Sequence, residues 1–318
     1  MTRRLPAWAL LALLSLVLAL GACRKDAPEE VKAPGDPVAA VEGLVKALRH
    51  NDLVRYSRLS LPPELHARSE ALWNQRVAQG EPVADADAAE YDKMMARLTA
   101  PNAEADLNRD LGPKLDKLEA EISGQWPMMQ ATALIFLNAA IQANTDLSDE
   151  EKAHGNDVVA GLMDWAQPAL FTDRGRARRA VSALVDTAKA LDLPTLAQAR
   201  ALPMLPAMEK AGIALAGFKK VAKAYDLDLD RALDGAQAEL VSAQGDRAQV
   251  KVSYPLLDKT VSFQMEMRRV GDGWFSAEAV QQAEDELAQA ATPGADSPDA
   301  TEDLAQAAET ADSTGADR

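Results

Sequence analysis

The stretch AQVKVSYPLLDKTVSFQMEMRRVGDGWF, residues 248–275, decides the fold class. Apolar and polar side chains alternate along its two halves. Val250 and Val252 share one face of the first half, and Phe263 and Met265 share one face of the second. A period of two is that of a half-buried β-strand, so each half is predicted to be a strand.

Glycine and aspartate mark the turns around these strands. Gly245-Asp246 separates residues 237–244 from the first strand, and Gly271-Asp272-Gly273 follows the second one. Short Gly-Asp segments between alternating runs are typical of β-hairpins. We therefore expect four antiparallel strands between about Gln237 and Ala279.

The chain before the strands, from Asp36 to Tyr225, is predicted to be helical almost throughout. Its first helix ends at Asn51-Asp52 and carries an apolar stripe at helical spacing, made of Val38, Val41, Leu44, Val45 and Leu48. The expected fold class is α+β, mostly α, with a large helical bundle inserted between this N-terminal helix and a C-terminal four-stranded antiparallel sheet.

The strands need an apolar cover, and the first helix offers a stripe of matching length. We expect Val41, Leu44 and Leu48 to pack against the inward-facing side chains of the strands, which are Val250, Val252, Phe263 and Met265. The alternative keeps the first helix in the bundle and covers the sheet with the helix near Ala207.

The first helix and the strands together resemble small envelope lipoproteins of NTF2-like or cystatin-like fold. The resemblance covers residues 37–61 and 237–279, and its motifs are Asn51-Asp52 and Gly271-Asp272-Gly273-Trp274. The resemblance implies a helix lying across the concave face of a curved sheet. It divides the chain into a split module, 37–62 and 236–280, and a helical insertion, 63–235, which departs from the family pattern.

The N-terminus has the layout of an export signal. Arg3 and Arg4 precede an apolar run from Leu5 to Leu20, which is short for a membrane span. Leu20-Gly21-Ala22-Cys23 resembles the lipobox of bacterial lipoproteins. The resemblance implies a signal peptide over 1–22, cleavage between Ala22 and Cys23, and acyl chains, palmitate among them, on Cys23. Residues 23–36 then form a tether, and Arg24 favours the outer membrane, periplasmic side.

The composition of the chain limits the classes of ligand and of cross-link that it can use. Cleavage would remove Arg3 and Arg4 and move the net charge from −15 to −17, a poor match to nucleic acid. Cys23 is the single cysteine, so no intramolecular disulfide can form. Residues 281–318 are acidic with little apolar bulk, so we expect a disordered tail that at most begins as a helix near Glu284.

Metal and catalytic motifs are weak. Glu151-x-x-His154 has the spacing of a di-iron motif, but a single copy is present, and Glu151 also completes a capping box with Ser148. His50 and His66 are expected at the surface. We therefore name no catalytic residue, metal ligand or cofactor.

Two charged segments have structural explanations. Asp226, Asp228 and Asp230 resemble the start of a calcium loop but lack its later glycine and glutamate, so Leu227 and Leu229 are expected to turn inward. The basic run at 174–179 is expected to be a solvated helix turn with Val181, Leu184 and Val185 on its buried side. Contact with anionic lipid or polysaccharide is the alternative.

Residues 122–145 contain no charged side chain. A helix that is apolar nearly all round lies in the centre of a bundle or in a membrane. Gln130, Asn138 and Gln142 argue against hydrocarbon, so we expect a buried central helix, with contact to a ligand or membrane as the alternative.

Together these features predict a non-catalytic, periplasm-facing envelope lipoprotein. It would be held at the membrane through Cys23 and bind another envelope component, such as a protein partner, through its helical domain. The alternative is a carrier with an apolar cavity for a small ligand. A hydrolase-type enzyme without an identifiable site comes third.

Overall fold

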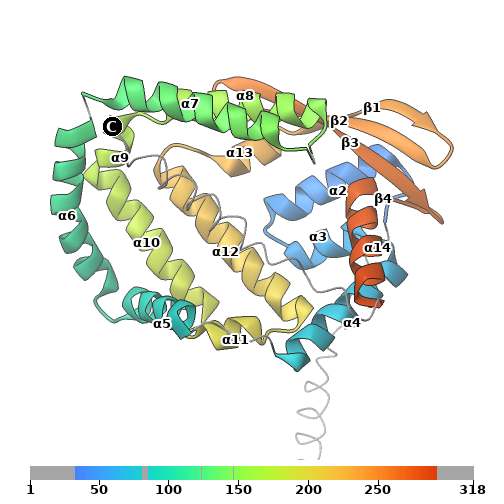
Figure 1. The fold of residues 1–318 in the computed structure, drawn as a ribbon, viewed down its shortest axis with the longest axis horizontal. Helices are drawn as coiled ribbons and strands as arrows, with labels where there is room; N and C mark the ends of the chain where they lie inside the picture. The colour runs from blue at the N-terminus through green and yellow to red at the C-terminus, as the bar shows by residue number, and fades with distance from the viewer. Residues whose placement is uncertain (1–32, 81–84, 123, 146, 292–318) are drawn as a thin grey trace, which may run out of the picture. The chain divides into compact units, whose positions relative to one another are not determined.

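The computed structural model describes residues 33–80, 85–122, 124–145 and 147–291 (Figure 1). The predicted signal peptide, the lipidation site Cys23 and residues 292–318 lie outside this part.

The helices before the sheet are α2 (Pro37–Arg49), α3 (Leu53–Ser60), α4 (Pro63–Gln79), α5 (Asp85–Thr99), α6 (Ala103–Ile122), α7 (Trp126–Ala143), α8 (Asp149–Trp165), α9 (Pro168–Thr172), α10 (Arg174–Leu191), α11 (Leu196–Arg200), α12 (Met204–Ala224) and α13 (Leu229–Asp234). The predicted fold class, mostly helical α+β, is confirmed.

A four-stranded antiparallel sheet follows, in the order β1 (Gln237–Gln244), β2 (Arg247–Leu256), β3 (Lys259–Val270) and β4 (Gly273–Ser276). Two-residue loops connect the strands. Gly245 and Gly271 begin two of them with φ of +64° and +60°, which glycine adopts without steric cost. The third loop begins with Leu257 at φ +56°, a strained conformation for a leucine.

The first helix packs on this sheet. Ala40 and Val41 of α2 form one hydrophobic cluster with strand residues, among them Val250, Val252 and Met267. The stripe differs in part from the prediction, because Val38 and Val45 pack against this cluster and Leu44 is buried outside it. Helical spacing defines an apolar stripe, but it does not fix which half of a wide stripe faces the sheet.

A buried lysine joins the helical region to α2. Lys219 of α12 has a relative exposure of 6%, and its Nζ donates to the carbonyl oxygen of Leu48 over 2.6 Å. The same Nζ lies 2.9 Å from Asp230 Oδ1 of α13. A cation at this end of α2 satisfies a terminal carbonyl group and opposes the negative pole of the helix dipole.

The helical region is built around α10 and α12, which lie side by side (Figure 1). Val181 and Val185 of α10 pack against Ala103 of α6. The predicted buried side of α10 is correct for these two valines and wrong for Leu184, which is 46% exposed. Alanines 177, 180, 183 and 188 take the remaining buried positions of α10, where their small side chains allow close helix packing.

The chain continues beyond the sheet as α14 (Ala277–Ala291), which contacts α4, β3 and β4. Val280 and Ala283 are buried in a cluster with Leu61, Leu65 and Phe275, and Leu287 packs against it. The prediction of a disordered tail from residue 281 was therefore wrong for residues 281–291, whereas the helical extension that it allowed near Glu284 is present and begins earlier, at Ala277. Their apolar side chains are few, but the i, i+3, i+7 spacing puts them on one helix face.

Candidate functional site

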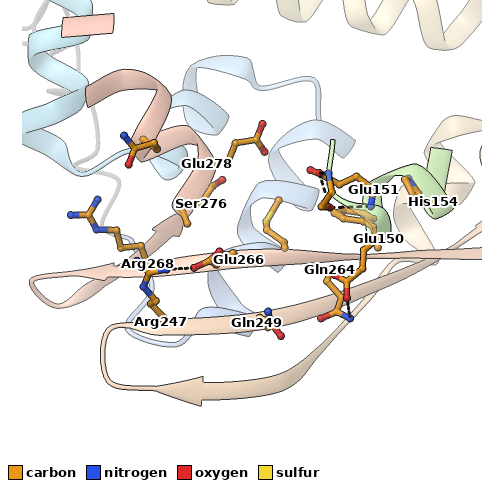
Figure 2. A pocket seen from close by; sticks show the side chains of 15 residues that line it. Glu150, Glu151, His154, Arg247, Gln249, Gln264, Glu266, Arg268, Ser276 and Glu278 are labelled. Atoms are coloured by element: carbon orange, nitrogen blue, oxygen red, sulfur yellow. Dashed lines mark hydrogen bonds and ion pairs between the residues drawn. The ribbon is translucent and has the colours of Figure 1, made fainter. Parts of the chain in front are cut away.

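The main candidate pocket is a groove of about 790 Å³ on β3, at the point where the sheet narrows (Figure 2). β4 pairs with residues 267–270 of β3, and α8 packs against the earlier part of β3. Glu150, Glu151 and His154 of α8 line one end, and Ser276 at the end of β4 and Glu278 in the first turn of α14 line the other. The strands between them contribute Arg247, Gln249, Gln264, Glu266 and Arg268.

The charged groups of the groove are paired with one another or with neighbours. Arg247 Nη1 lies 2.9 Å from Glu266 Oε1, and Arg268 Nη1 lies 3.2 Å from Glu284 Oε2. Gln264 donates to Glu150 over 3.3 Å. Both arginines of the groove are thus neutralised by glutamates, whereas Glu150 and Glu151 accept from neutral groups and leave the α8 end of the groove acidic.

The predicted capping box is present at the groove end of α8. Glu151 N donates to Ser148 Oγ over 3.2 Å, and the Ser148 amide donates to Glu151 Oε2 over 2.7 Å. This backbone hydrogen bond is the main cause that lowers the pKa of Glu151, and the bond from the Ser148 hydroxyl adds to it. Glu151 is therefore an ionised helix cap.

His154 uses both ring nitrogens within the fold. Nδ1 lies 3.2 Å from the carbonyl oxygen of Ser262, which can only accept, so Nδ1 carries the proton. Nε2 lies 3.3 Å from Tyr254 Oη, whose pKa burial raises, so the phenol keeps its proton and donates. Edge contacts with Tyr254 and Phe263 complete the packing. His154 therefore covers the open backbone edge of β3.

Both serines of the groove also have structural roles. Ser148 Oγ donates to Glu151, and Ser276 Oγ accepts from the backbone N–H of Ala279 at the start of α14. The Glu151 carboxylate that accepts from the Ser148 hydroxyl also accepts from the Ser148 amide, so this contact is part of the capping box, and the Ser276 hydroxyl caps α14. Within the described residues, no cluster of His, Cys, Asp and Glu could hold a metal ion.

His66 is buried, with a relative exposure of 7%, so the prediction of a surface histidine was wrong. Its Nε2 lies 3.2 Å from Ser57 Oγ, and its Nδ1 lies 4.0 Å from Glu70 Oε2. The Ser57 hydroxyl donates its proton to the carbonyl oxygen of Val54, so Nε2–H supplies the second bond. The direction of these bonds is opposite to that of a base-activated serine. His50, by contrast, is exposed as expected.

The three aspartates of the calcium-like segment diverge. Asp226 pairs with Arg176, Asp228 with Lys223 at 2.8 Å, and Asp230 with Lys219. Asp228 also accepts from the Arg231 amide and caps α13. Leu227 and Leu229 are half-buried. Because each carboxylate faces a different cation, the segment does not form a calcium loop.

The basic run is likewise tied into the fold. Arg174 pairs with Asp116 of α6, Arg176 pairs with Asp226, and Arg179 donates to the carbonyl oxygen of Ala224 over 3.4 Å. These contacts fix α10 against its neighbours. They agree with the structural explanation of the run, and three of its four arginines already have protein partners.

The most unusual surface is helix α7. Met128, Ile135 and Phe136 have relative exposures of 68%, 71% and 72%, and Met129 has 44%. These four side chains define what we call the α7 outer face. The expectation that this helix is a buried central one was wrong, because none of its residues is buried.

The opposite side of α7 packs on α8. Gln130 donates to the carbonyl oxygen of Met163, and Ile141 Cδ1 lies 3.3 Å from the position that a Cβ would take at Gly155. α8 in turn packs on β3, so α7 is held one layer away from the sheet (Figure 1). No helix in the described part of the chain is long and apolar enough to cross a bilayer.

Comparisons with known proteins give no relative for this chain. No family model, no curated protein and no solved structure matches it.

Proposed function

We propose that this chain is a non-catalytic, lipid-anchored protein of the bacterial envelope that faces the periplasm and binds another envelope component through the α7 outer face. The exposure of Met128, Ile135 and Phe136 carries the proposal. An unpaired apolar surface costs free energy in water, and on soluble proteins such surfaces mark interaction sites. The lipobox at Cys23 and Arg24 after it support the outer membrane as the location.

The alternatives have less support. The groove on β3 is lined mainly by charged and amide side chains, whereas a carrier of a small apolar ligand needs an apolar cavity. The histidines and serines closest to a catalytic arrangement, His154, Ser148, His66 and Ser57, form hydrogen bonds whose direction suits capping and packing. The NTF2-like or cystatin-like resemblance stays a proposal, supported by the packing of α2 on the strands.

A photo-crosslinking experiment in native envelopes tests this function. Benzoylphenylalanine replaces Phe136 in the full chain, and in a matched variant it replaces Phe218 of α12, which is 60% exposed. We expect adducts, protein or lipid, from position 136 and few from position 218. Equal adduct formation at both positions, or none at 136, would contradict the proposal.

A further inference from the structure

The α7 outer face carries one further inference, which concerns the nature of its partner. A helix of 18 residues is about 27 Å long, and an outer strip about 10 Å wide covers on the order of 300 Å². A stable protein–protein complex buries roughly 800 Å² on each partner. The face alone is therefore too small for a stable dimer or a stable free complex.

Charge selects further among partners. The chain has a net charge of −15, yet residues 122–145 contain no charged side chain. A second copy would bring its own negative charge close to the acids at the start of α8, Asp149 and Glu150, which follow α7 directly. An uncharged apolar strip instead matches a partner with an apolar interior, such as the acyl-chain region of a bilayer.

The predicted anchor supplies the missing affinity. Ten peptide units join Cys23 to Ala33, the first described residue, and they span at most about 35 Å. A body tethered this closely meets the membrane at a high effective concentration, so a weak contact is occupied without a large interface.

We propose that the α7 outer face rests on the bilayer that holds the acyl chains of Cys23, with Phe136, Ile135 and Met128 among the lipid headgroups and upper acyl carbons. The helix lies in the membrane surface and does not span it. This inference rests on the proposed function, because it assumes that the face is a binding surface and that Cys23 is lipidated.

Fluorescence quenching by spin-labelled lipid tests the proposed membrane contact of α7 on the lipidated full-length protein. Because Cys23 is the single cysteine and its sulfur is blocked by lipid, Phe136→Cys offers one labelling site for an environment-sensitive dye. The labelled protein is placed in nanodiscs of phosphatidylethanolamine and phosphatidylglycerol, one copy per disc, with or without doxyl-labelled lipid. Phe218→Cys is the matched control, and Met128→Cys is a second probe should the first variant fold poorly.

We expect the dye at 136 to shift to the blue and to lose most of its emission with doxyl lipid, whereas the dye at 218 stays unquenched. Added salt should not reduce the quenching, because the contact is apolar and salt screens only the repulsion between the acidic chain and phosphatidylglycerol. Unquenched dye at both 136 and 128 overturns the inference. If position 136 still crosslinks to a protein in native envelopes, the proposed function survives with a protein partner. If it crosslinks to nothing, both proposals fail.

Discussion

The ammonium group of Lys219 lies 2.6 Å from the carbonyl oxygen of Leu48, 171 residues earlier in the chain. This buried bond, together with the ion pair to Asp230, connects α12 and α13 to the end of the helix that covers the sheet. Lys219 thus links the helical region to the helix–sheet module, together with the ion pairs from Arg49 of α2 to Asp230 and Asp234 of α13.

Replacing this lysine should destabilise the fold. Lys219→Met keeps the length of the side chain but removes the charged donor to the Leu48 carbonyl oxygen, which keeps the backbone N–H of Asn51. Asp230 keeps Arg49 as its remaining cation, at 3.4 Å. We expect a loss of about 1.5–3 kcal/mol in the free energy of unfolding, measured by urea denaturation. Lys223→Met is the control, since Lys223 is 66% exposed and pairs with Asp228 at the surface. Equal effects of the two changes would show that burial of Lys219 contributes nothing.

The position of α14 gives a second prediction. Ala283 is buried against the start of α4, whereas Ala290 on the same helix is exposed. Ala283→Gln should cost about 1–3 kcal/mol of unfolding free energy, because the longer amide overpacks the cluster or loses its hydration. Ala290→Gln, the same change in a solvated position, should stay within about 0.5 kcal/mol. A neutral Ala283→Gln would mean that α14 does not pack as described.

Burial of His66 predicts a pH dependence of stability. Desolvation lowers the pKa of His66 below its ordinary value of 6.5, although Glu70 opposes this shift. Across the window below 6.5 the unfolded chain binds more protons than the folded chain, so the free energy of unfolding rises with pH. His66→Gln should flatten this rise between roughly pH 5 and 7, measured as melting temperature against pH.

The control for this titration is His50→Gln, because His50 is exposed at the end of α2. That variant should keep the slope of the wild type. If His66→Gln keeps the wild-type slope of melting temperature against pH, then groups other than His66 cause the pH dependence.

The lipid anchor is tested apart from the fold. Cys23 lies outside the described residues, and its modification is predicted from Leu20-Gly21-Ala22-Cys23 alone. Metabolic labelling with a fatty-acid probe should mark the wild type and leave Cys23→Ala unmarked. Equal labelling of both proteins would exclude Cys23 as the acylated residue.

The parts of the fold that the sequence predicts best are those with one clear period. Alternation at Val250, Val252 and Phe263 placed the sheet and its buried face correctly, because a strand has only two faces. The side of α2 that meets the strands was less certain, since Val38 and Val45 pack on the cluster where Leu44 was expected. A small rotation of α2 within its wide apolar stripe changes which of these side chains meet the sheet and still keeps polar groups away from it.

The candidate site was harder to predict for the same physical reason. A helix such as α7 has apolar residues on all sides, so its sequence indicates no inner face, and packing with α8 decides that Ile141 turns inward and Phe136 outward. Sequence patterns do not predict the burial of His66 and His154, because it depends on how separate elements pack. Ser57 of α3 lies against His66 of α4, and Ser262 of β3 lies against His154 of α8.

The two sides of α7 allow the last prediction. Ile135 is 71% exposed on the outer face, whereas Ile141 contacts Gly155 of α8. Ile141→Ala should cost about 1–3 kcal/mol of unfolding free energy, because it opens a gap between the two helices. Ile135→Ala should leave stability unchanged or raise it by a few tenths of a kcal/mol, since alanine is the better helix former and no packing is lost. Chemical denaturation of the two variants compares the same substitution on one helix. A large loss from Ile135→Ala would mean that the outer face is packed within the protein itself, and an apolar surface open to a membrane or partner would then not exist at α7.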